Sequence, residues 1–430
     1  MSDAFHIPSP GALSRRRFLT STGAGVLGLS AFGCDGRRTP SAGSNRPALT
    51  RPIGSDDAAW AHVRDQFILE PGVAYMNNAS LGMPPAVVVE AVAAGYEAIS
   101  REPLHGKHDL QDQIAQQVIP DLARLLGVSP DEVVLTRNAT EALHLQAVGL
   151  DLEPGDEVIF TTQEHPAGLR PWLFRAERDR IQATDIFVPS PLESHDHVVD
   201  LFEQAMTPRT RAIAFCHVTR GGHRYPVKRL AEMARSHGLL TLVDGAQALG
   251  QFPIDLHDLG CDAYSASLHK WLLGPVGTGF LYVRENARPH LRSAFAHDAT
   301  LEAPALAPPG TAAFPLRASI GAALSFVETI GLDNVAIRTR YLSDYLKDRL
   351  SAMGGVTLLS GTVAQSCPGS TIFEMEGVDA MALVPVMDER HAIQLDEHQR
   401  DGHNAIRIST HIYNTTAEID RLVAALESLT

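Results

Sequence analysis

Hydrophobic and polar residues alternate along the middle of this chain in a pattern that predicts strands and helices in turn. Short apolar runs are typical of buried strands, and the stretches between several of them have helical periodicity. Strands are expected at Glu157–Thr162, Asp185–Val188, Ala212–His217, Leu239–Val243 and Gly279–Val283. This alternation favours an α/β fold with a mainly parallel sheet covered by helices.

Helical periodicity also occurs before and after this region. Helices are expected near Trp60 and at Ala86–Ser100, Gln111–Leu126, Leu201–Met206, Val227–His237 and Leu316–Ile330. The last of them is long and amphipathic, and it leads into a smaller α+β domain at the C-terminal end. In that domain, helices and strands are expected at Tyr341–Met353, Ser370–Met375, Ile406–Ser409 and Ala417–Leu429.

The chain is therefore expected to have two folded domains. The large domain spans residues 59–315, and the interdomain helix and small domain span residues 316–430. The N-terminal part of the first range is left open between the two domains. Residues 35–58 are rich in Arg, Pro, Ser and Gly, which is typical of a flexible linker.

Residues 1–34 have the pattern of an export signal. The sequence SRRRFL at Ser14–Leu19 precedes a weakly apolar run, Thr20–Gly33, which is too short and too rich in glycine to predict a membrane span. This resembles a twin-arginine signal, so we expect export by the twin-arginine translocation machinery to a periplasmic or other extracytoplasmic location. Cys34 follows, and lipidation there, a cleaved signal and an uncleaved anchor are the alternatives.

Composition excludes some partners. The formal net charge of −14 and the pI near 5.7 oppose binding to nucleic acid, which depends on clustered basic residues. The four cysteines are far apart and form no C-x-x-C pair, so neither a zinc module nor a dense disulfide framework is implied, and no metal site is predicted. They are Cys34, Cys216, Cys261 and Cys367.

Polar residues follow several of the predicted strands. Because ligands bind at the carboxyl ends of parallel strands, we expect these residues to form the functional site. They are Asn138–Thr140, Glu164–His165, His217–His223, Asp244–Gln247 and Ser265–Lys270.

Lys270 is a candidate nucleophile. It is one of four lysines in the chain, and it alone is followed by an apolar run, Trp271–Leu273, so we expect it to face a dry site. A partly buried lysine loses part of its ammonium character and can form an imine with a carbonyl group. The alternative is a lysine whose stem packs on apolar surface while its amine reaches water.

Asp244 and Arg407 are expected to bind charged groups. Asp244 ends an apolar strand and needs a cationic or hydrogen-bonding partner, which a protonated ring nitrogen can supply; Gln247 can then reach a ring substituent. Arg407 alternates with apolar residues and can hold a substrate carboxylate with its guanidinium. The alternatives are an Asp that caps the next helix and an Arg in a structural salt bridge.

Two further loops are candidate binding sites. A helix is expected to begin at about Thr140, and its free N–H groups with the Thr140 hydroxyl make a site for an anion such as phosphate. The alternative is that Thr140 is only an N-cap. The loop containing Asn77 and Asn78 lies between a strand and a helix that begins with proline, and it predicts either a substrate contact or a turn capped by these residues.

With these residues in hand, the chain resembles the class V aminotransferase family of fold-type I pyridoxal-phosphate enzymes, which includes cysteine desulfurases and isopenicillin N epimerase-like proteins. The resemblance extends from about Val73 to the C-terminus. The motifs that carry it are TRNATEA at 136–142, Glu164–His165, DGAQ at 244–247, SLHK at 267–270, Gly310–Thr311 and RISTHIYN at 407–414.

The resemblance implies a role for each matching residue. Lys270 would form the internal aldimine and transfer the proton, and His165 would stack on the cofactor ring. Asp244 would pair with the ring nitrogen, and Gln247 with the ring oxygen. The phosphate would be bound by Ala139, Thr140, Ser267 and His269, and by Thr311 of the other subunit of a homodimer. Arg407 would bind the substrate carboxylate, with Asn78 as a second candidate contact.

Two departures from the family pattern bear on the reaction. Desulfurases need a mobile cysteine upstream of the carboxylate-binding arginine, and none occurs between Met387 and Ile406, which argues against desulfuration by that route. Arg220 stands where the family often has Asn or Ser. Arg220 and Arg224 therefore favour an acidic substrate group, with solvated arginines as the alternative.

The sequence thus predicts an exported pyridoxal-phosphate enzyme that acts on an amino acid or related amine, of the aminotransferase or epimerase type. A C–S lyase that catalyses β-elimination is one alternative. A catalytically silent exported binding protein that kept the fold is another.

Overall fold

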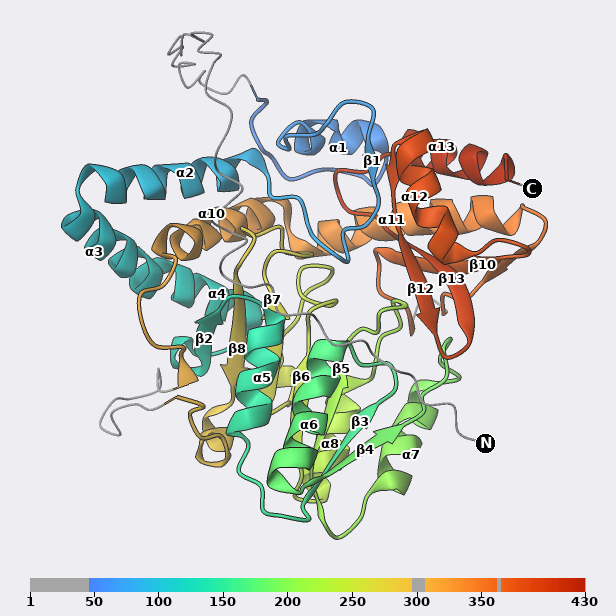
Figure 1. Ribbon diagram of the computed structural model, residues 1–430. Coiled ribbons are helices and arrows are strands. Elements are labelled where there is room, and N and C mark those ends of the chain that lie inside the picture. Colours follow the sequence, from blue (N-terminus) through green and yellow to red (C-terminus); the bar gives the residue numbers. More distant parts are fainter. Residues whose placement is uncertain (1–45, 296–305, 362–364, 430) are drawn as a thin grey trace, which may run out of the picture. The chain divides into compact units, whose positions relative to one another are not determined.

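The computed structural model describes residues 46–295, 306–361 and 365–429 (Figure 1). The predicted signal at residues 1–34, including Cys34, lies outside the described residues. From Arg46 onwards the chain forms one compact unit, which includes the second half of the predicted linker. The first helix, α1 (Asp57–Arg64), is capped by Asp56 and buries Trp60 completely, as expected for a short helix at this point.

A seven-stranded sheet forms the centre of this unit. Its strand order is β2–β8–β7–β6–β5–β3–β4, and every neighbouring pair is parallel except the two that involve β8. The strands are β2 (Val133–Thr136), β3 (Glu157–Thr161), β4 (Gln182–Ile186), β5 (Thr210–Cys216), β6 (Leu240–Asp244), β7 (Ala263–Ser267) and β8 (Gly279–Val283). The mainly parallel sheet predicted from the sequence is confirmed.

Helices cover both faces of this sheet, which is why its inner strands are buried along nearly their whole length rather than on alternate residues. Ile213 and Phe215 of β5 belong to one core, and Ala212 and Ala214 to the core on the opposite face. The first face is covered by α4 (Ile119–Leu126), α7 (His195–Ala205), α8 (Val227–Ser236) and α10 (Phe314–Ile330), and the second by α5 (Ala139–Gly149) and α6 (Pro166–Asp179).

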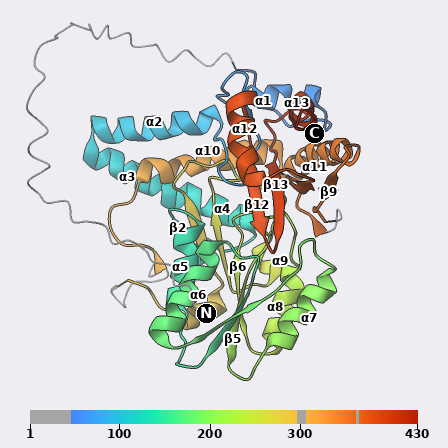
Figure 2. The same ribbon diagram turned by 45° about the vertical axis from the view of Figure 1, so that its right-hand side comes forward.

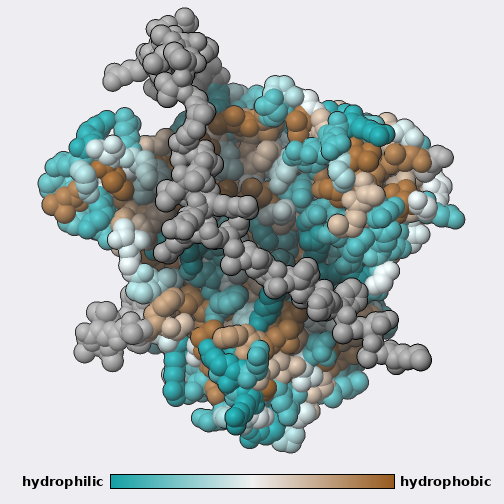
Figure 3. All heavy atoms as spheres, in the orientation of Figure 1, coloured by the Kyte–Doolittle hydropathy of each residue, from teal (hydrophilic) through white to brown (hydrophobic). Residues whose placement is uncertain are grey.

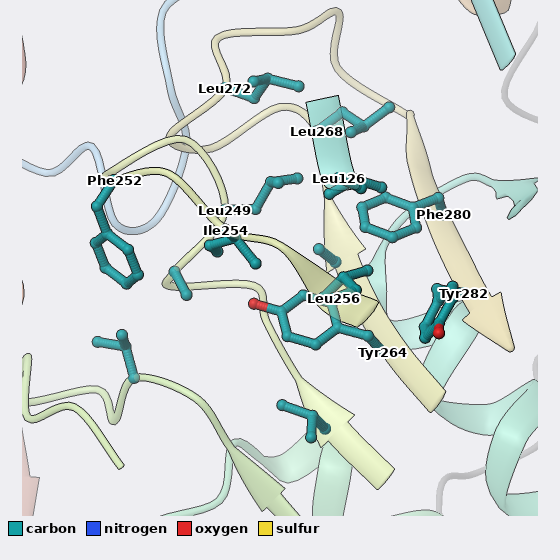
Figure 4. Close-up of a cluster of buried hydrophobic side chains, with 14 of the residues drawn as sticks. Leu126, Leu249, Phe252, Ile254, Leu256, Tyr264, Leu268, Leu272, Phe280 and Tyr282 are labelled. Carbon is teal, nitrogen blue, oxygen red and sulfur yellow. The ribbon is translucent and has the colours of Figure 1, made fainter. Parts of the chain in front are cut away.

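The larger core continues beyond the sheet into the segment that follows β6. Figure 4 shows Ile254 and Leu256 of this segment near Tyr264 of β7, with Phe252 farther to the left and Phe280 of β8 to the right. All of these side chains are buried. The short helix α9 (Leu256–Leu259) and the 3-10 turns η2 (Pro130–Glu132) and η3 (Glu285–His290) lie around this part of the sheet.

The C-terminal region forms a smaller antiparallel sheet of order β12–β13–β10–β9 (Figure 2). Its elements are β9 (Val356–Leu358), β10 (Ser370–Met375), α12 (Ala380–His391), β12 (Asp396–Arg400), β13 (His403–Ser409) and α13 (Thr416–Glu427). The N-terminal strand β1 (Ala74–Tyr75) pairs in parallel with β11 (Ile393–Gln394) of this region. The start of the folded chain is therefore attached to the small domain.

Two helices link the domains. α10 packs on the large domain, and α11 (Leu332–Ser351) packs on the small one, with a bend of 74° at Gly331, whose φ of +86° favours glycine. Within the described ranges, no single helix has both the length and the apolar composition of a membrane span, and α10 and α11 pass that test only as a bent pair.

The N-terminal helices extend beside α10. α2 (Ala86–Arg101) contacts α10 and α3 (Pro103–Gln113), and α3 continues through the π-helical turn η1 (Ile114–Val118) into α4. Several large apolar side chains of this region are exposed, and Figure 3 shows hydrophobic residues among hydrophilic ones over the α2–α3 pair. They are Val87, Val89, Tyr96 and Leu104.

Most predicted elements agree with the structure to within a few residues. The prediction was less accurate for β4, which begins three residues and ends two residues earlier than expected, because this edge strand is largely polar and half-exposed. β12 was not predicted, because its residues Asp396–Arg400 are all polar.

Candidate active site

A cavity of about 300 Å³ lies where the carboxyl ends of β2, β3, β5, β6 and β7 meet the small domain. Most of the residues predicted to bind a cofactor or substrate line it together. They are Ala139, Thr140, His165, Asp244, Gln247, Ser267, His269, Lys270 and Arg407. Among the described residues, no group of three or more His, Cys, Asp or Glu is arranged to hold a metal ion.

Lys270 lies in the turn after β7, held in place by Trp271, Leu272 and Leu273, which are completely buried. Burial lowers the pKa of the Lys270 amine from 10.5 to about 8; the carboxylate of Asp244 opposes this shift, and the charge of Arg407 adds to it. The amine is therefore neutral far more often than that of an exposed lysine at the same pH. The expected dry environment of Lys270 is confirmed. The alternative, a lysine whose amine reaches bulk water, does not agree with the structure.

Asp244 is the last residue of β6 and is 6% exposed. Its Oδ1 accepts a hydrogen bond from the Ala246 backbone N–H at 2.8 Å, and its carboxylate forms no ion pair within the described chain. Burial raises its pKa, an effect that the hydrogen bond and the charge of Lys270 reduce. A buried carboxylate with so few partners is suited to a cationic ring nitrogen, so this position fits the pyridinium of pyridoxal phosphate.

The end of the cavity at α5 fits a phosphate group. Asn138, not Thr140, is the N-cap of α5: its Oδ1 accepts from the Glu141 N–H at 2.8 Å. Thr140 therefore does not have the capping role that was its alternative, and it lines the cavity. Ser267 Oγ accepts from the Ala139 N–H at 2.9 Å, which brings this hydroxyl to the helix terminus. Helix N-termini bind anions through such N–H groups.

His269 completes this end of the cavity. Its Nδ1 donates to the Thr278 carbonyl oxygen at 2.9 Å, so Nε2 can donate to an anion only when the ring is protonated. Burial lowers the pKa of His269, and a bound phosphate dianion would raise it again.

His165 and Gln247 are also held by local contacts. His165 is the N-cap of α6, and its Nδ1 accepts from the Ala167 N–H at 3.1 Å, so Nε2 carries the hydrogen of the neutral ring. Burial lowers the pKa of His165 to about 4, which keeps this ring neutral. Gln247 donates to the Ala79 carbonyl oxygen and accepts from Trp271 Nε1, each at 2.9 Å.

Arg407 lies in β13 directly opposite Asp396 of β12, and its guanidinium is 2% exposed. It pairs with the Asp396 carboxylate and donates to Asn77 Oδ1 at 3.2 Å, while its Nε has no partner among the described residues. Burial and the charge of Arg220 lower its pKa to about 10. Asp396 thus occupies the guanidinium that was predicted to bind a substrate carboxylate.

Arg220 lies beside this pair. Its Nη2 donates to Glu397 Oε1 at 2.9 Å and lies 3.3 Å from Asp396 Oδ2. The solvated arginine considered from the sequence is therefore wrong for Arg220, which lines the cavity and is paired with acidic residues. Two guanidinium groups and two carboxylates balance each other at the substrate end of the site.

Two predicted residues lie elsewhere. Asn78 does not line the cavity: it is completely buried, and its Oδ1 accepts from the Tyr413 hydroxyl at 2.8 Å. Its neighbour Asn77 contacts Arg407 instead, because adjacent residues of this extended segment point to different sides. Thr311 is exposed and outside the cavity of its own chain, so its predicted contact with the other subunit stays a prediction.

The family described as "Aminotransferase class-V" matches residues 74–422 of the chain. Isopenicillin N epimerase of Amycolatopsis lactamdurans is 31% identical over 86% of this chain and 98% of its own length. A probable cysteine desulfurase of Halalkalibacterium halodurans is 29% identical over 85% of this chain and 95% of its own length.

The chain is also similar to solved structures of pyridoxal-phosphate enzymes. A lysine-to-alanine mutant of C-DES with glycine covalently linked to its PLP cofactor has a TM-score of 0.78 and 25% identity, and the match covers 84% of this chain and 98% of that one. The cysteine desulfurase CsdA of Escherichia coli has a TM-score of 0.76 and 26% identity, with 86% and 98% covered.

The environment of Lys270 predicts its titration. In the apoprotein, we expect the Lys270 amine to deprotonate with a midpoint near pH 8. Lys228 is not buried, and its ion pair with Asp258 raises the pKa of its amine. Asp244→Asn should lower the Lys270 midpoint, because a stabilising negative charge is lost. Arg407→Ala should raise it, because a repelling positive charge is lost.

Competitive acetylation over a pH series, read by peptide mass spectrometry, measures both lysines in one sample. Lys228 serves as the internal reference. A midpoint for Lys270 at the ordinary 10.5, or shifts of the opposite sign in the two variants, would show that the described charges do not control this amine.

Proposed function

Because the chain belongs to the class V aminotransferase family of pyridoxal-phosphate enzymes, we propose that its cavity binds this cofactor and acts on an amino acid held through its carboxylate. The observation that carries the proposal is the convergence of Lys270, Asp244 and Arg407 on one cavity. A nucleophilic amine, a carboxylate for the ring nitrogen and a guanidinium for the substrate are the three groups this chemistry needs.

Each of the predicted residues that line the cavity has a defined role in this proposal. When bound, pyridoxal phosphate supplies an electron sink for bond cleavage at the amino acid's Cα. Asp244 keeps the ring nitrogen protonated, and the neutral ring of His165 stacks on the cofactor. Lys270, whose lowered pKa makes it an effective base near neutral pH, would remove the proton at Cα, the step that epimerisation, transamination and β-elimination share.

The phosphate is held at the N-terminus of α5. Thr140 offers its backbone N–H and its hydroxyl there, Ala139 positions the Ser267 hydroxyl by donating its N–H to Oγ, and Ser267 and the protonated His269 add side-chain donors. Gln247 orients the ring oxygen. These contacts would fix the position of the cofactor relative to Lys270.

We assign the reaction to the epimerase or aminotransferase type. The relative that is an isopenicillin N epimerase supports this assignment, since the match covers 86% of this chain and 98% of the epimerase. The cysteines offer further support. Among the described residues only Cys216 lines the cavity, and burial raises its thiol pKa well above the ordinary value, so it is a poor nucleophile for desulfuration.

A C–S lyase is the second candidate, and it fits about as well. The observation that favours it is the similarity to C-DES, which is called a cystine C-S lyase in its complex with cysteine persulfide. β-Elimination needs the same proton removal at Cα, so Lys270, Asp244 and Arg407 serve both reactions.

An amino-acid panel in D₂O separates the candidates. For an epimerase, we expect deuterium at Cα and inversion with the amino group retained. An aminotransferase gives a keto acid, and a lyase releases a sulfur compound and ammonia from cystine or cysteine. NMR and colorimetric assays report these products, with Lys270→Ala as the inactive control. Absence of every product and of Cα exchange from the panel would contradict the proposal.

A homodimer completes the site in this proposal. The exposed apolar residues of α2 and α3 offer a surface suited to a second copy of the chain. The exposed Thr311 is then available to the phosphate site of the partner subunit.

Export by the twin-arginine route is part of the proposal, because this route carries folded proteins and lets the cofactor bind before transport. Changing Arg15, Arg16 and Arg17 to Lys should trap the enzyme in the cytoplasm. Cell fractionation with immunoblotting measures its location, and unchanged export of the triple variant would refute the route.

A further inference from the structure

A second cavity, of about 620 Å³, lies on the other side of the loop that follows β5. Val218 and Arg220 of this loop line the active-site cavity, whereas His217 and Arg224 line the second one. Its remaining walls come from α4, from residues 252–259 and from the C-terminal end of α10. Arg224, which the sequence grouped with Arg220 as a candidate contact to an acidic substrate group, therefore lies outside the active-site cavity, and no described residue lines both cavities.

Arg224 is a half-buried cation in this cavity without an acidic partner. The centre of its guanidinium lies 4.2 Å above the ring of Phe252, and its side chain makes no hydrogen bond or ion pair with any residue the structure describes. Burial lowers its pKa. A guanidinium that is partly desolvated and has no counter-ion favours the binding of an anion.

The acidic residues around the cavity do not supply that anion, because other groups engage them. Asp121 and Glu328 pair with Arg124 at 3.1 and 2.7 Å. Asp258 pairs with Lys228 at 2.6 Å, and Asp255 caps α9 by accepting from the Asp258 N–H at 2.9 Å.

His217 provides a second donor beside Arg224. Its Nδ1 lies 3.0 Å from the Tyr264 hydroxyl, for which the described residues offer no other acceptor, so the hydroxyl donates and Nε2 carries the ring hydrogen. Burial lowers the pKa of His217 to about 3, so the ring is neutral, and Nε2–H has no partner in the described chain.

Phe252 holds these two donors together. The His217 ring meets the Phe252 ring edge to face, with centroids 5.6 Å apart, while Arg224 stacks over the same ring. Figure 4 shows the Tyr264 hydroxyl pointing toward the side of the cluster on which Phe252 lies. The Arg224 guanidinium and the neutral His217 ring thus both contact the Phe252 ring and form one continuous binding surface with it.

We propose that this second cavity binds a small organic monocarboxylate, whose oxygens accept hydrogen bonds from Arg224 and His217. Leu125, Leu324 and Val327 line the cavity and offer apolar contacts to the rest of the ligand. A multiply charged anion such as phosphate is disfavoured, because four carboxylates border the same cavity. The proposal does not depend on the reaction assigned to the active site.

The probe for this site is 4-fluorobenzoate, followed by fluorine NMR on the full-length holoenzyme. Because Arg407 also binds carboxylates in our proposal, we expect two bound environments in the wild type. Arg224→Gln should weaken one of them at least tenfold and leave the other, and Arg407→Ala should do the reverse. Arg224→Lys, which keeps the charge but loses the planar fork, should give an intermediate affinity for the first environment.

Arg229→Gln is the matched control, because this exposed arginine of α8 is paired with Asp196 at 2.6 Å, away from the cavity. It should bind the probe as the wild type does, and the thermal midpoints of the variants identify any that fail to fold. Phe252→Leu, which keeps both donors but removes the ring that supports them, is the second test and should weaken the same environment as Arg224→Gln.

Three results would overturn the second site. They are no binding of the probe to the wild type at millimolar concentration, unchanged binding in Arg224→Gln, and loss of all binding in Arg407→Ala. Failure of the active-site proposal gives a different pattern, in which the Arg224-dependent environment remains and the Arg407-dependent one is missing.

Discussion

Two groups of opposite charge, Asp244 and Lys270, are kept out of water at the carboxyl edge of one parallel sheet. β6 and β7 are neighbours, so the residues that end them converge without any long-range loop. Burial shifts both groups toward their neutral forms, and the charge of each opposes the shift of the other. The site is thereby prepared for a ring that brings its own positive charge, and the buried strands and helices around it maintain the dry environment on which this depends.

A second balance of charge connects the two domains. Asp396 and Arg407 face each other on adjacent strands of the small domain, and Arg220 reaches them from the large domain. A substrate carboxylate that binds Arg407 meets a desolvated guanidinium whose Nη2 is engaged by Asp396 and Asn77 and whose Nε has no partner among the described residues. Either it binds beside Asp396 or it replaces Asp396 as the counter-ion. Because Arg220 belongs to the other domain, substrate binding at this pair is also sensitive to the relative position of the domains.

Asp244 and Lys270 could be predicted from the sequence, because Asp244 ends an apolar strand and Lys270 follows the end of the next one. Arg407 could be predicted because it alternates with apolar residues inside a strand. Periodicity also predicts parallel strands, whose carboxyl ends meet at one edge of the sheet. Asp396 could not be predicted, because it lies in a polar edge strand whose pattern resembles a loop. Nor could the sequence decide between Asn77 and Asn78, since the backbone alone determines which of two adjacent side chains faces Arg407. The environment of Arg224 could not be predicted either, because Phe252, which lies under its guanidinium, is distant in the sequence and contacts it only in the folded chain.

The central claim is that Lys270 is the residue that joins the cofactor to the protein. Borohydride reduction of the purified holoenzyme, followed by peptide mass spectrometry, tests it directly, because the chain has only four lysines to distinguish. We expect a pyridoxyl group on Lys270 and on no other residue, and none in the Lys270→Ala variant. A pyridoxyl group on Lys107, Lys228 or Lys347, or an unmodified Lys270 in protein that contains the cofactor, would contradict the account.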